Sequence, residues 1–321
     1  MNYRQFRRAL TEEISRRSGE EIEISFRDMQ SNNDIHAEAI MLGSGYGKFL
    51  PSIDMNILYQ EYGKGVSVRH LAKLLIHQYQ EVQKKYSIPG DFFASYERVS
   101  GRIYCKLVSR AQNAKLLAEV PNCSWADLAV IVYYRMEPTL VEGGTITIQR
   151  EHLHRWGVDS EELFRNAWEN TASAMHPVLR PLSNVLSELE KEEGAVHEEE
   201  SASYKDDAEY GENAEYGEET ESEEDNRRCP LYILTNQDKC YGAISIAIPG
   251  EAEMIAENIR SDYYVLPSSI HECLILPDDG SYKTEFLNEL VRSVNDTQVD
   301  PSEVLSDHVY HYSRLCGGFD I

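Results

Sequence analysis

An acidic stretch at residues 188–225 places the strongest constraint on how this chain can fold. It contains 18 Asp and Glu residues against only Lys191 and Lys205, a net charge of −16, and almost no aliphatic side chains. Carboxylates that repel one another, with no apolar surface to bury, cannot offset the entropy lost on ordering. The sequence therefore predicts two folded parts separated by a disordered acidic insert, with the boundaries 1–187, 188–228 and 229–321.

The rest of the chain has an ordinary charge for a folded protein. Its 283 residues carry 37 acidic and 29 basic side chains, a net charge of −8. A negative surface repels phosphate backbones and anionic lipids, so we expect neither nucleic acid nor a membrane as a partner. A protein partner is the remaining expectation, and the sequence indicates no oligomeric state.

The amino-terminal stretch MNYRQFRRALTEEISRRSG lacks the apolar core and the small-residue cleavage site of a secretion signal. No apolar run approaches the length needed to span a membrane. The six cysteines are dispersed without a CxxC pair, which is typical of reduced thiols rather than of a disulfide framework or a zinc ribbon. We expect a cytoplasmic protein.

Hydrophobic periodicity in the first part alternates between helix and strand patterns. Apolar residues at helical spacing predict helices over about 2–17 and from Ser67 onward. Strands are expected at 21–26, 36–42, 48–56 and 102–108, and the apolar run at 127–134 predicts a central strand buried on both faces. Asp159 and Glu162 resemble a capping box that opens a further helix.

The second part has a similar mixture of elements. LYILTN (231–236) and YGAISIAI (241–248) are expected to form a hairpin, and a helix should follow Gly250. Two strands are expected at 263–267 and 271–277, a long helix marked by Phe286, Leu290 and Val294, and a last strand at 308–312. Together these patterns predict an α+β fold of mixed or antiparallel sheets covered by helices.

The segment PSSIHE, residues 267–272, carries the most reactive combination of side chains. Two hydroxyls, an imidazole and a carboxylate, from Ser268, Ser269, His271 and Glu272, lie at one strand entry. A hydrolase would use such groups as nucleophile, base and orienting acid. The strand, GxSxG turn and helix of a nucleophile elbow are absent, however, and a turn with a hydrogen-bonded histidine explains the same residues. Both interpretations stay open at this stage.

Other patterns give weaker indications. The glycine-rich loop Gly43–Lys48 is followed by a strand pattern, so it lacks the helix N-terminus that holds phosphate. His152 with His154, and His308 with His311, each lack a third metal ligand nearby. The sequence therefore predicts no cofactor and no metal.

Several segments resemble a family of uncharacterised bacterial proteins found mainly in anaerobic Gram-positive gut organisms. The similarity lies in YVLPSSIHECLILPDDG, LYILTN and VDPSEVLSDHVYHY, and in RIYCKL, DLAVIVYY, HLHRWGV and EELFRNAWENT of the first part. The family is a domain of unknown function, so the resemblance implies no activity, ligand or catalytic residue. It skips only the acidic insert. The order of elements also resembles that of another unassigned bacterial family, in which the two halves are joined by a short connection, and this second resemblance implies that the insert interrupts parts that pack together.

From these observations we expect a non-catalytic binding or regulatory protein. The first alternative is a hydrolase that uses Ser268 or Ser269 with His271 and Glu272. The second is an acidic nucleic-acid mimic, or a docking protein for a basic partner, in which the insert makes the contact.

Overall fold

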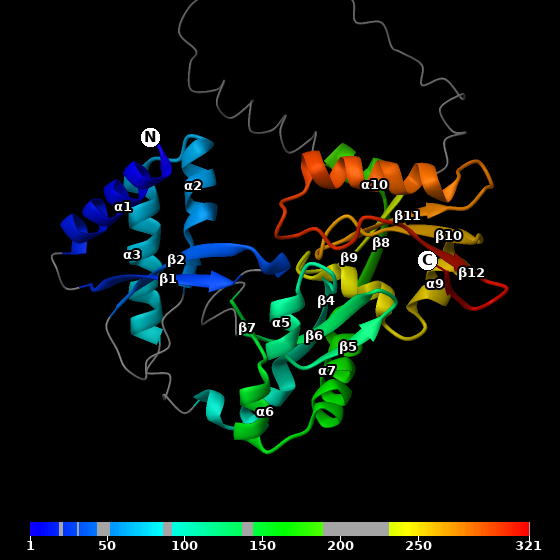
Figure 1. Ribbon diagram of the computed structural model, residues 1–321, viewed down its shortest axis with the longest axis horizontal. Helices are drawn as coiled ribbons and strands as arrows, with labels where there is room; N and C mark the ends of the chain where they lie inside the picture. The colour runs from blue at the N-terminus through cyan, green and yellow to red at the C-terminus, as the bar shows by residue number, and fades with distance from the viewer. Residues whose placement is uncertain are drawn as a thin grey trace, which may run out of the picture. The chain divides into compact units, whose positions relative to one another are not determined.

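The computed structural model describes residues 1–18, 22–30, 32–43, 52–85, 92–136, 144–188 and 231–320. The described chain forms two compact units: unit 1 is Met1–Met175 with Asp300–Leu305, and unit 2 is His176–Val299 with Ser306–Ile321. Three antiparallel sheets with accompanying helices give an α+β fold, as the sequence predicts (Figure 1). The predicted insert lies outside the described residues except for Glu188, and the predicted boundaries at 187 and 229 stay a prediction.

Unit 1 contains two of the sheets, in the strand orders β1-β2-β3 and β4-β6-β5, with β7 also paired to β6. Its elements in chain order, with η for 3-10 helices, are α1 (Tyr3–Ser18), β1 (Ile24–Gln30), η1 (Asn32–Asp34), β2 (His36–Leu42), β3 (Ser52–Asp54), α2 (Met55–Gly63), α3 (Val68–Lys85), η2 (Phe92–Ala94), α4 (Tyr96–Val99), η3 (Ser100–Arg102), β4 (Ile103–Ser109), α5 (Ala114–Glu119), β5 (Asn122–Trp125), β6 (Leu128–Arg135), β7 (Thr145–Thr147), α6 (Arg150–Trp156) and α7 (Ser160–Ala174).

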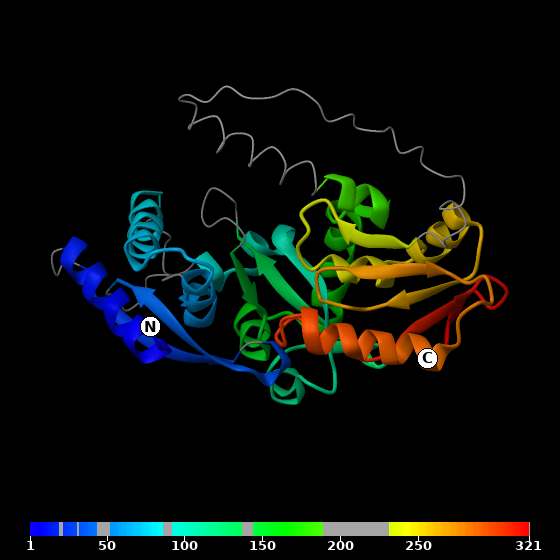
Figure 2. The same cartoon turned by 90° about the horizontal axis from the view of Figure 1, so that it is seen from above.

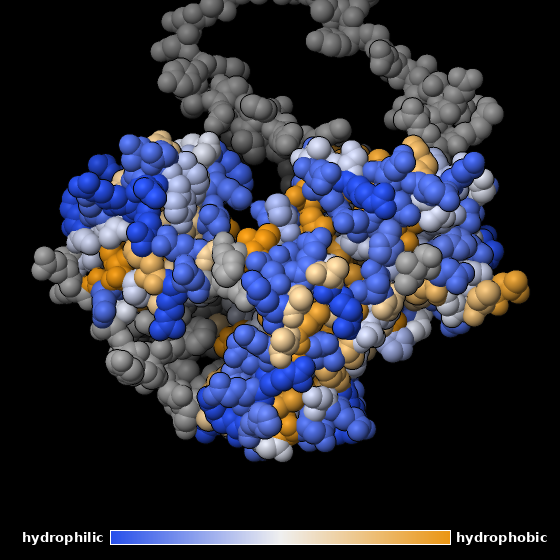
Figure 3. All heavy atoms as spheres, viewed as in Figure 1, coloured by the Kyte–Doolittle hydropathy of each residue, from blue (hydrophilic) through white to orange (hydrophobic). Residues whose placement is uncertain are grey.

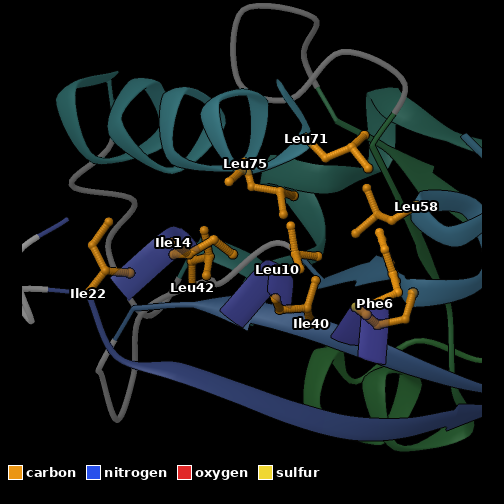
Figure 4. Packing of buried hydrophobic residues seen from close by; sticks show 11 residues of the cluster. Phe6, Leu10, Ile14, Ile22, Ile40, Leu42, Leu58, Leu71 and Leu75 are labelled. Carbon is orange, nitrogen blue, oxygen red and sulfur yellow. The ribbon is translucent and has the colours of Figure 1, made fainter. Parts of the chain in front are cut away.

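The helix α1 packs through one apolar face, as its periodicity predicts. Phe6, Leu10 and Ile14 are fully buried and recur every four residues, so they lie along one side of the helix. They form one cluster with Ile40 of β2 and Leu71 of α3 (Figure 4). This cluster is the core of the first sheet and its helices.

The strand β6 is the centre of the second sheet of unit 1. Every residue from Leu128 to Tyr134 is buried, which confirms the predicted two-faced strand. Its neighbour β4 is an edge strand, and α7 provides hydrogen bonds along that edge. The Thr171 hydroxyl accepts the backbone N–H of Cys105, and the Asn170 amide donates to the Ile103 carbonyl. The predicted cap of α7 is also confirmed, because the Asp159 carboxylate accepts the N–H of Glu162.

A short segment from late in the sequence, Asp300–Leu305, completes unit 1. Two asparagines of η1 hold it through side-chain amides. Asn32 donates to the Ser302 carbonyl at 2.7 Å, and Asn33 donates to the Pro301 and Val304 carbonyls, each at 2.8 Å. Asn33 has a left-handed backbone with φ of 60°, which asparagine tolerates better than most residues.

Unit 2 is built on one six-stranded sheet in the order β13-β12-β10-β11-β9-β8. The long helix α10 runs along one face of this sheet (Figure 2). On the other face lie α9 and η5, where the Tyr263 hydroxyl donates to the Ala252 carbonyl of α9. The elements are β8 (Pro177–Pro181), β9 (Tyr232–Asn236), η5 (Gly242–Ala247), α9 (Glu251–Ile259), β10 (Tyr263–Leu266), β11 (Cys273–Pro277), α10 (Thr284–Gln298), β12 (Tyr310–Ser313) and β13 (Gly318–Asp320).

The residues 189–230 connect two strands that are neighbours in this sheet. β8 pairs with β9 in antiparallel register from Pro177↔Asn236 to Pro181↔Tyr232. Beyond the last pair, the Leu182 N–H donates to the Leu231 carbonyl at 2.7 Å. The chain therefore leaves the sheet and re-enters it at adjacent positions.

One strand prediction was wrong, and a second was wrong at its end. Residues 241–248 do not form a hairpin partner for β9, because β9 already has β8 on one edge and β11 on the other. They form the 3-10 helix η5, of which Gly242 through Ile246 are all buried. Of the predicted strand at 48–56, residues 48–51 lie outside the described ranges and Ser52–Asp54 form β3. Its last two residues were predicted wrongly, because Asp54 accepts the N–H of Asn56 and so starts α2 at Met55.

Candidate functional site

The predicted reactive segment forms a tight turn between β10 and β11. The Ser269 hydroxyl accepts the backbone N–H groups of His271 at 3.1 Å and of Glu272 at 3.2 Å. Ser269 is buried, and these two bonds close the turn that joins antiparallel neighbours. The structure brings Ser269, His271 and Glu272 together, but the Ser269 hydroxyl bonds to the backbone of the other two residues.

The imidazole of His271 holds the loop that precedes η5. Its Nδ1 accepts the backbone N–H of Tyr241 at 3.1 Å, and its ring stacks on the Tyr241 ring with centroids 5.4 Å apart. Because Nδ1 accepts this bond, the neutral ring carries its proton on Nε2. The carbonyl of His271 also accepts the Thr235 hydroxyl at 2.9 Å. These contacts give His271 a structural role at this place.

The close approach of the two segments requires a glycine at position 242. A Cβ added there would lie 2.4 Å from the Thr235 hydroxyl oxygen, 2.6 Å from the His271 carbonyl and 2.7 Å from the Asn236 nitrogen. The preceding Tyr241 has a left-handed backbone with φ of 52°. The turn at 268–272 and the loop at 239–242 are therefore fitted against each other without spare room.

This turn borders two cavities of unit 2. Glu272 lines the smaller one, which has a volume of about 240 Å³. Two cationic side chains, Arg180 and Lys239, and two carboxylates, Glu188 and Glu272, line the smaller cavity. Arg180 is already paired with Glu188, so the charges in this cavity are balanced by its own lining.

Ser268 lines the larger cavity, a groove of about 720 Å³ along α10. We call it the α10 groove. Its volume falls in the range of about 300–1,000 Å³ that is typical of small-molecule sites. Aliphatic side chains make up most of its lining, and the residues are Leu231, Leu266, Ser268, Leu274, Leu276, Asp279, Ser281, Tyr282, Phe286, Leu287, Leu290, Val291, Val294 and Asn295.

The apolar arc of α10 is wider than the sheet can cover. Leu287 and Val291 are buried against Tyr264, Leu266 and Leu276 of the sheet. The predicted marker residues lie on the neighbouring side, where Phe286 is 54% and Leu290 43% exposed. The helix was predicted correctly, but the residues that marked it in the sequence are not the ones that it buries. The visible surface is otherwise mostly hydrophilic, with apolar residues in limited patches (Figure 3).

Polar groups line the α10 groove near both ends of α10. Near its start, the exposed Asp279 accepts the N–H of Ser281 at 2.9 Å, and this bond holds the pKa of the carboxyl below its usual value. Further along, Asn295 is buried and its amide donates to the Ser306 carbonyl and to Asp307. Its Oδ1 is buried and accepts no hydrogen bond from the described part of the chain.

Three of the four candidate histidines, His152, His308 and His311, have local partners. His152 Nδ1 accepts the N–H of Gln149, and burial lowers the pKa of its ring. His311 Nε2 lies 2.9 Å from Asp278. No group of three or more His, Cys, Asp or Glu side chains is arranged to hold a metal ion among the residues that the structure describes. Of the predicted loop Gly43–Lys48, residues 44–48 lie outside the described ranges.

A comparison with protein families matches residues 3–314 to DUF5688, a family of unknown function. The chain belongs to this family. The DUF5688 match runs through both units and through the turn at 268–272, the loop at 239–242 and the α10 groove. No curated protein and no solved structure matches the chain. Within the described ranges, none of the helices is both long enough and apolar enough to cross a bilayer.

The α10 groove is the feature of this DUF5688 member that sequence reasoning missed. The helix pattern alone holds no clear signal for it. Apolar residues at 286, 287, 290, 291 and 294 span an arc of about 140° at 100° per residue, which is the width of an ordinary core-facing stripe. Such an arc does not show which of its residues stay exposed beside the core.

Proposed function

We propose that this protein is a non-catalytic binding protein that holds a small apolar or amphiphilic molecule in the α10 groove. The groove supports the proposal because it combines suitable size with an aliphatic lining and few polar groups. Leaving Phe286 and Leu290 exposed is unfavourable, by about 25 cal/mol for each Å² of apolar surface in water. A ligand that covers these side chains regains that free energy.

The hydrolase alternative has weaker support. A nucleophile needs its hydroxyl within reach of a base that can take its proton. In the turn at 268–272, the Ser269 hydroxyl and the Nδ1 of His271 are each bonded to backbone N–H groups. Ser268 lines the α10 groove instead, so this residue is available to contact a ligand there.

The remaining expectations are part of the same proposal. We propose a cytoplasmic bacterial protein, from a family concentrated in anaerobic Gram-positive gut organisms.

The acidic insert supports a separate proposal, that the chain docks on a basic protein, because its −16 charge at 188–225 would favour such a partner.

The experiment measures binding of decanol and of the neutral dye Nile red to the full chain. We expect saturable binding with one site per chain. Replacing Val294, a half-buried residue in the groove lining, by Trp fills the groove, so Val294→Trp should weaken binding about tenfold or more, a loss of about 1.4 kcal/mol.

The matched control is Ser293→Trp, which adds the same side chain one residue away, at an exposed position outside the groove lining. It should bind both probes like the natural sequence. Absence of saturable binding to the natural sequence would overturn the proposal. Sedimentation is run in parallel, because a dimer that Val294→Trp alone dissociates would assign the groove to a second copy of the chain instead.

A further inference from the structure

We infer that the α10 groove selects a cationic amphiphile, whose alkyl tail lies along α10 and whose ammonium group lies beside Asp279. This inference rests on the proposed function and adds the charge of the ligand. Three observations carry it: the charge of the lining, the position of the carboxylate, and an aromatic pair in the same lining.

The lining of the groove carries charge of one sign. Asp279 is the only ionisable acid or base in it besides the Tyr282 phenol, and no Lys, Arg or His lines it within the described residues. An amphiphile that buries its tail must leave its head at the mouth of the groove. A carboxylate or phosphate head there would face a like charge with no cation in the lining to offset it.

Asp279 is ionised and exposed, which suits a head group that stays partly hydrated. Its Oδ1 accepts the Ser281 N–H, and this bond together with the Ser281 side chain lowers its pKa, so the carboxyl is an anion at neutral pH. The preceding Asp278 is bonded to His311 Nε2 at 2.9 Å. Lys283 is close in sequence but does not line the groove.

An aromatic pair lines the same groove as this carboxylate. The rings of Tyr282 and Phe286 are stacked, with centroids 6.3 Å apart and planes at 12°. Both residues line the groove and are exposed, at 38% and 54%. Aromatic faces attract ammonium groups through their electron-rich surfaces and repel anions. A groove whose aliphatic lining also contains one exposed carboxylate and two exposed aromatic rings is complementary to an alkylammonium ion.

The test compares decylammonium, decanol and decanoate, which share one alkyl chain and differ in head-group charge. Binding to the full chain is measured by calorimetry at neutral pH, below the concentrations at which the amphiphiles form micelles. We expect decylammonium to bind most tightly and decanoate most weakly. Asp279→Asn should weaken decylammonium about fivefold and leave decanol unchanged, because an exposed charge pair contributes at most about that factor.

The matched control is Asp296→Asn, which changes the net charge equally at an exposed position of α10 outside the lining. It should leave all three affinities unchanged. Equal effects of the two substitutions, or tightest binding of decanoate, would overturn the inference while the proposed function stands. If none of the three amphiphiles binds the natural sequence, the proposed function fails and the inference fails with it.

Discussion

At the scale of single residues, the side chains of the turn at 268–272 are explained by hydrogen bonds that hold two segments together. The Ser269 hydroxyl closes the turn, and the His271 ring accepts the Tyr241 N–H while stacking on its side chain. The closeness in sequence of a hydroxyl, an imidazole and a carboxylate is therefore explained by the structure of the turn.

Replacing His271 by Ala tests this explanation. The substitution removes the acceptor of the partly buried Tyr241 N–H and the stacked ring, so the free energy of unfolding should fall by about 1–3 kcal/mol. Urea titration measures the loss. Ser268→Ala, in the same turn, should change stability by less than about 0.5 kcal/mol. The hydrolase interpretation makes the opposite prediction, in which His271→Ala abolishes hydrolysis of an ester and leaves the unfolding transition unchanged.

At the scale of elements, Gly242 is where the loop before η5 meets β9 and the turn after β10. A side chain at this position would overlap with two backbone atoms and a hydroxyl, at 2.4–2.7 Å. Neither β9 nor the turn at 268–272 can move away easily, because β9 and the strands that flank the turn are paired in the sheet of unit 2.

Gly242→Ala should therefore lower the free energy of unfolding by about 1–3 kcal/mol, the usual cost of forcing extra volume into a packed site. Gly318→Ala is the control, because a Cβ there meets nothing within 4 Å and the position has no positive φ. Thermal unfolding of both variants measures the difference. Equal transitions would contradict the close approach described for Gly242.

The elements that the sequence predicted correctly are those in which a local signal coincides with burial. The run at 127–134 is buried on both faces, and the Asp159 cap forms within one turn of its helix. The error at 241–248 arose because residues far away in the sequence decide which strands pair. Apolar residues alternate along 241–248 as they do in a strand. However, β8 and β11 occupy both edges of β9, so this segment cannot pair with β9.

The α10 groove could not be predicted for the same reason. Periodicity identified the helix, but which side of its wide apolar arc meets the sheet depends on Tyr264, Leu266 and Leu276, whose orientation the helix sequence does not contain. The turn at 268–272 was located correctly by sequence, and only the structure gives the partners of its side chains.

At the scale of the whole molecule, the position of the acidic insert between β8 and β9 allows it to be tested separately from the fold. Deleting residues 191–226 leaves a short connection between strands that remain paired. The unfolding free energy should stay the same or rise, by at most about 2 kcal/mol, because closing a shorter loop costs less entropy.

If the insert docks on a basic partner, the same deletion should abolish binding of a lysine-rich peptide, and added salt should weaken binding to the full chain. Calorimetry with the peptide measures both effects. Unaltered peptide binding by the deletion variant would reject this role for the insert, whereas loss of folding would contradict the pairing of β8 with β9.

The segment Asp300–Leu305 has a consequence for how the protein is made. Unit 1 begins at the first residue, yet the carbonyls that Asn32 and Asn33 require belong to Pro301, Ser302 and Val304. During synthesis on a ribosome, these amides find their acceptors only after residue 304 has been added. Unit 1 therefore reaches its final state only after most of unit 2 has been synthesised, and a gene fragment that stops at Met175 encodes an incomplete unit.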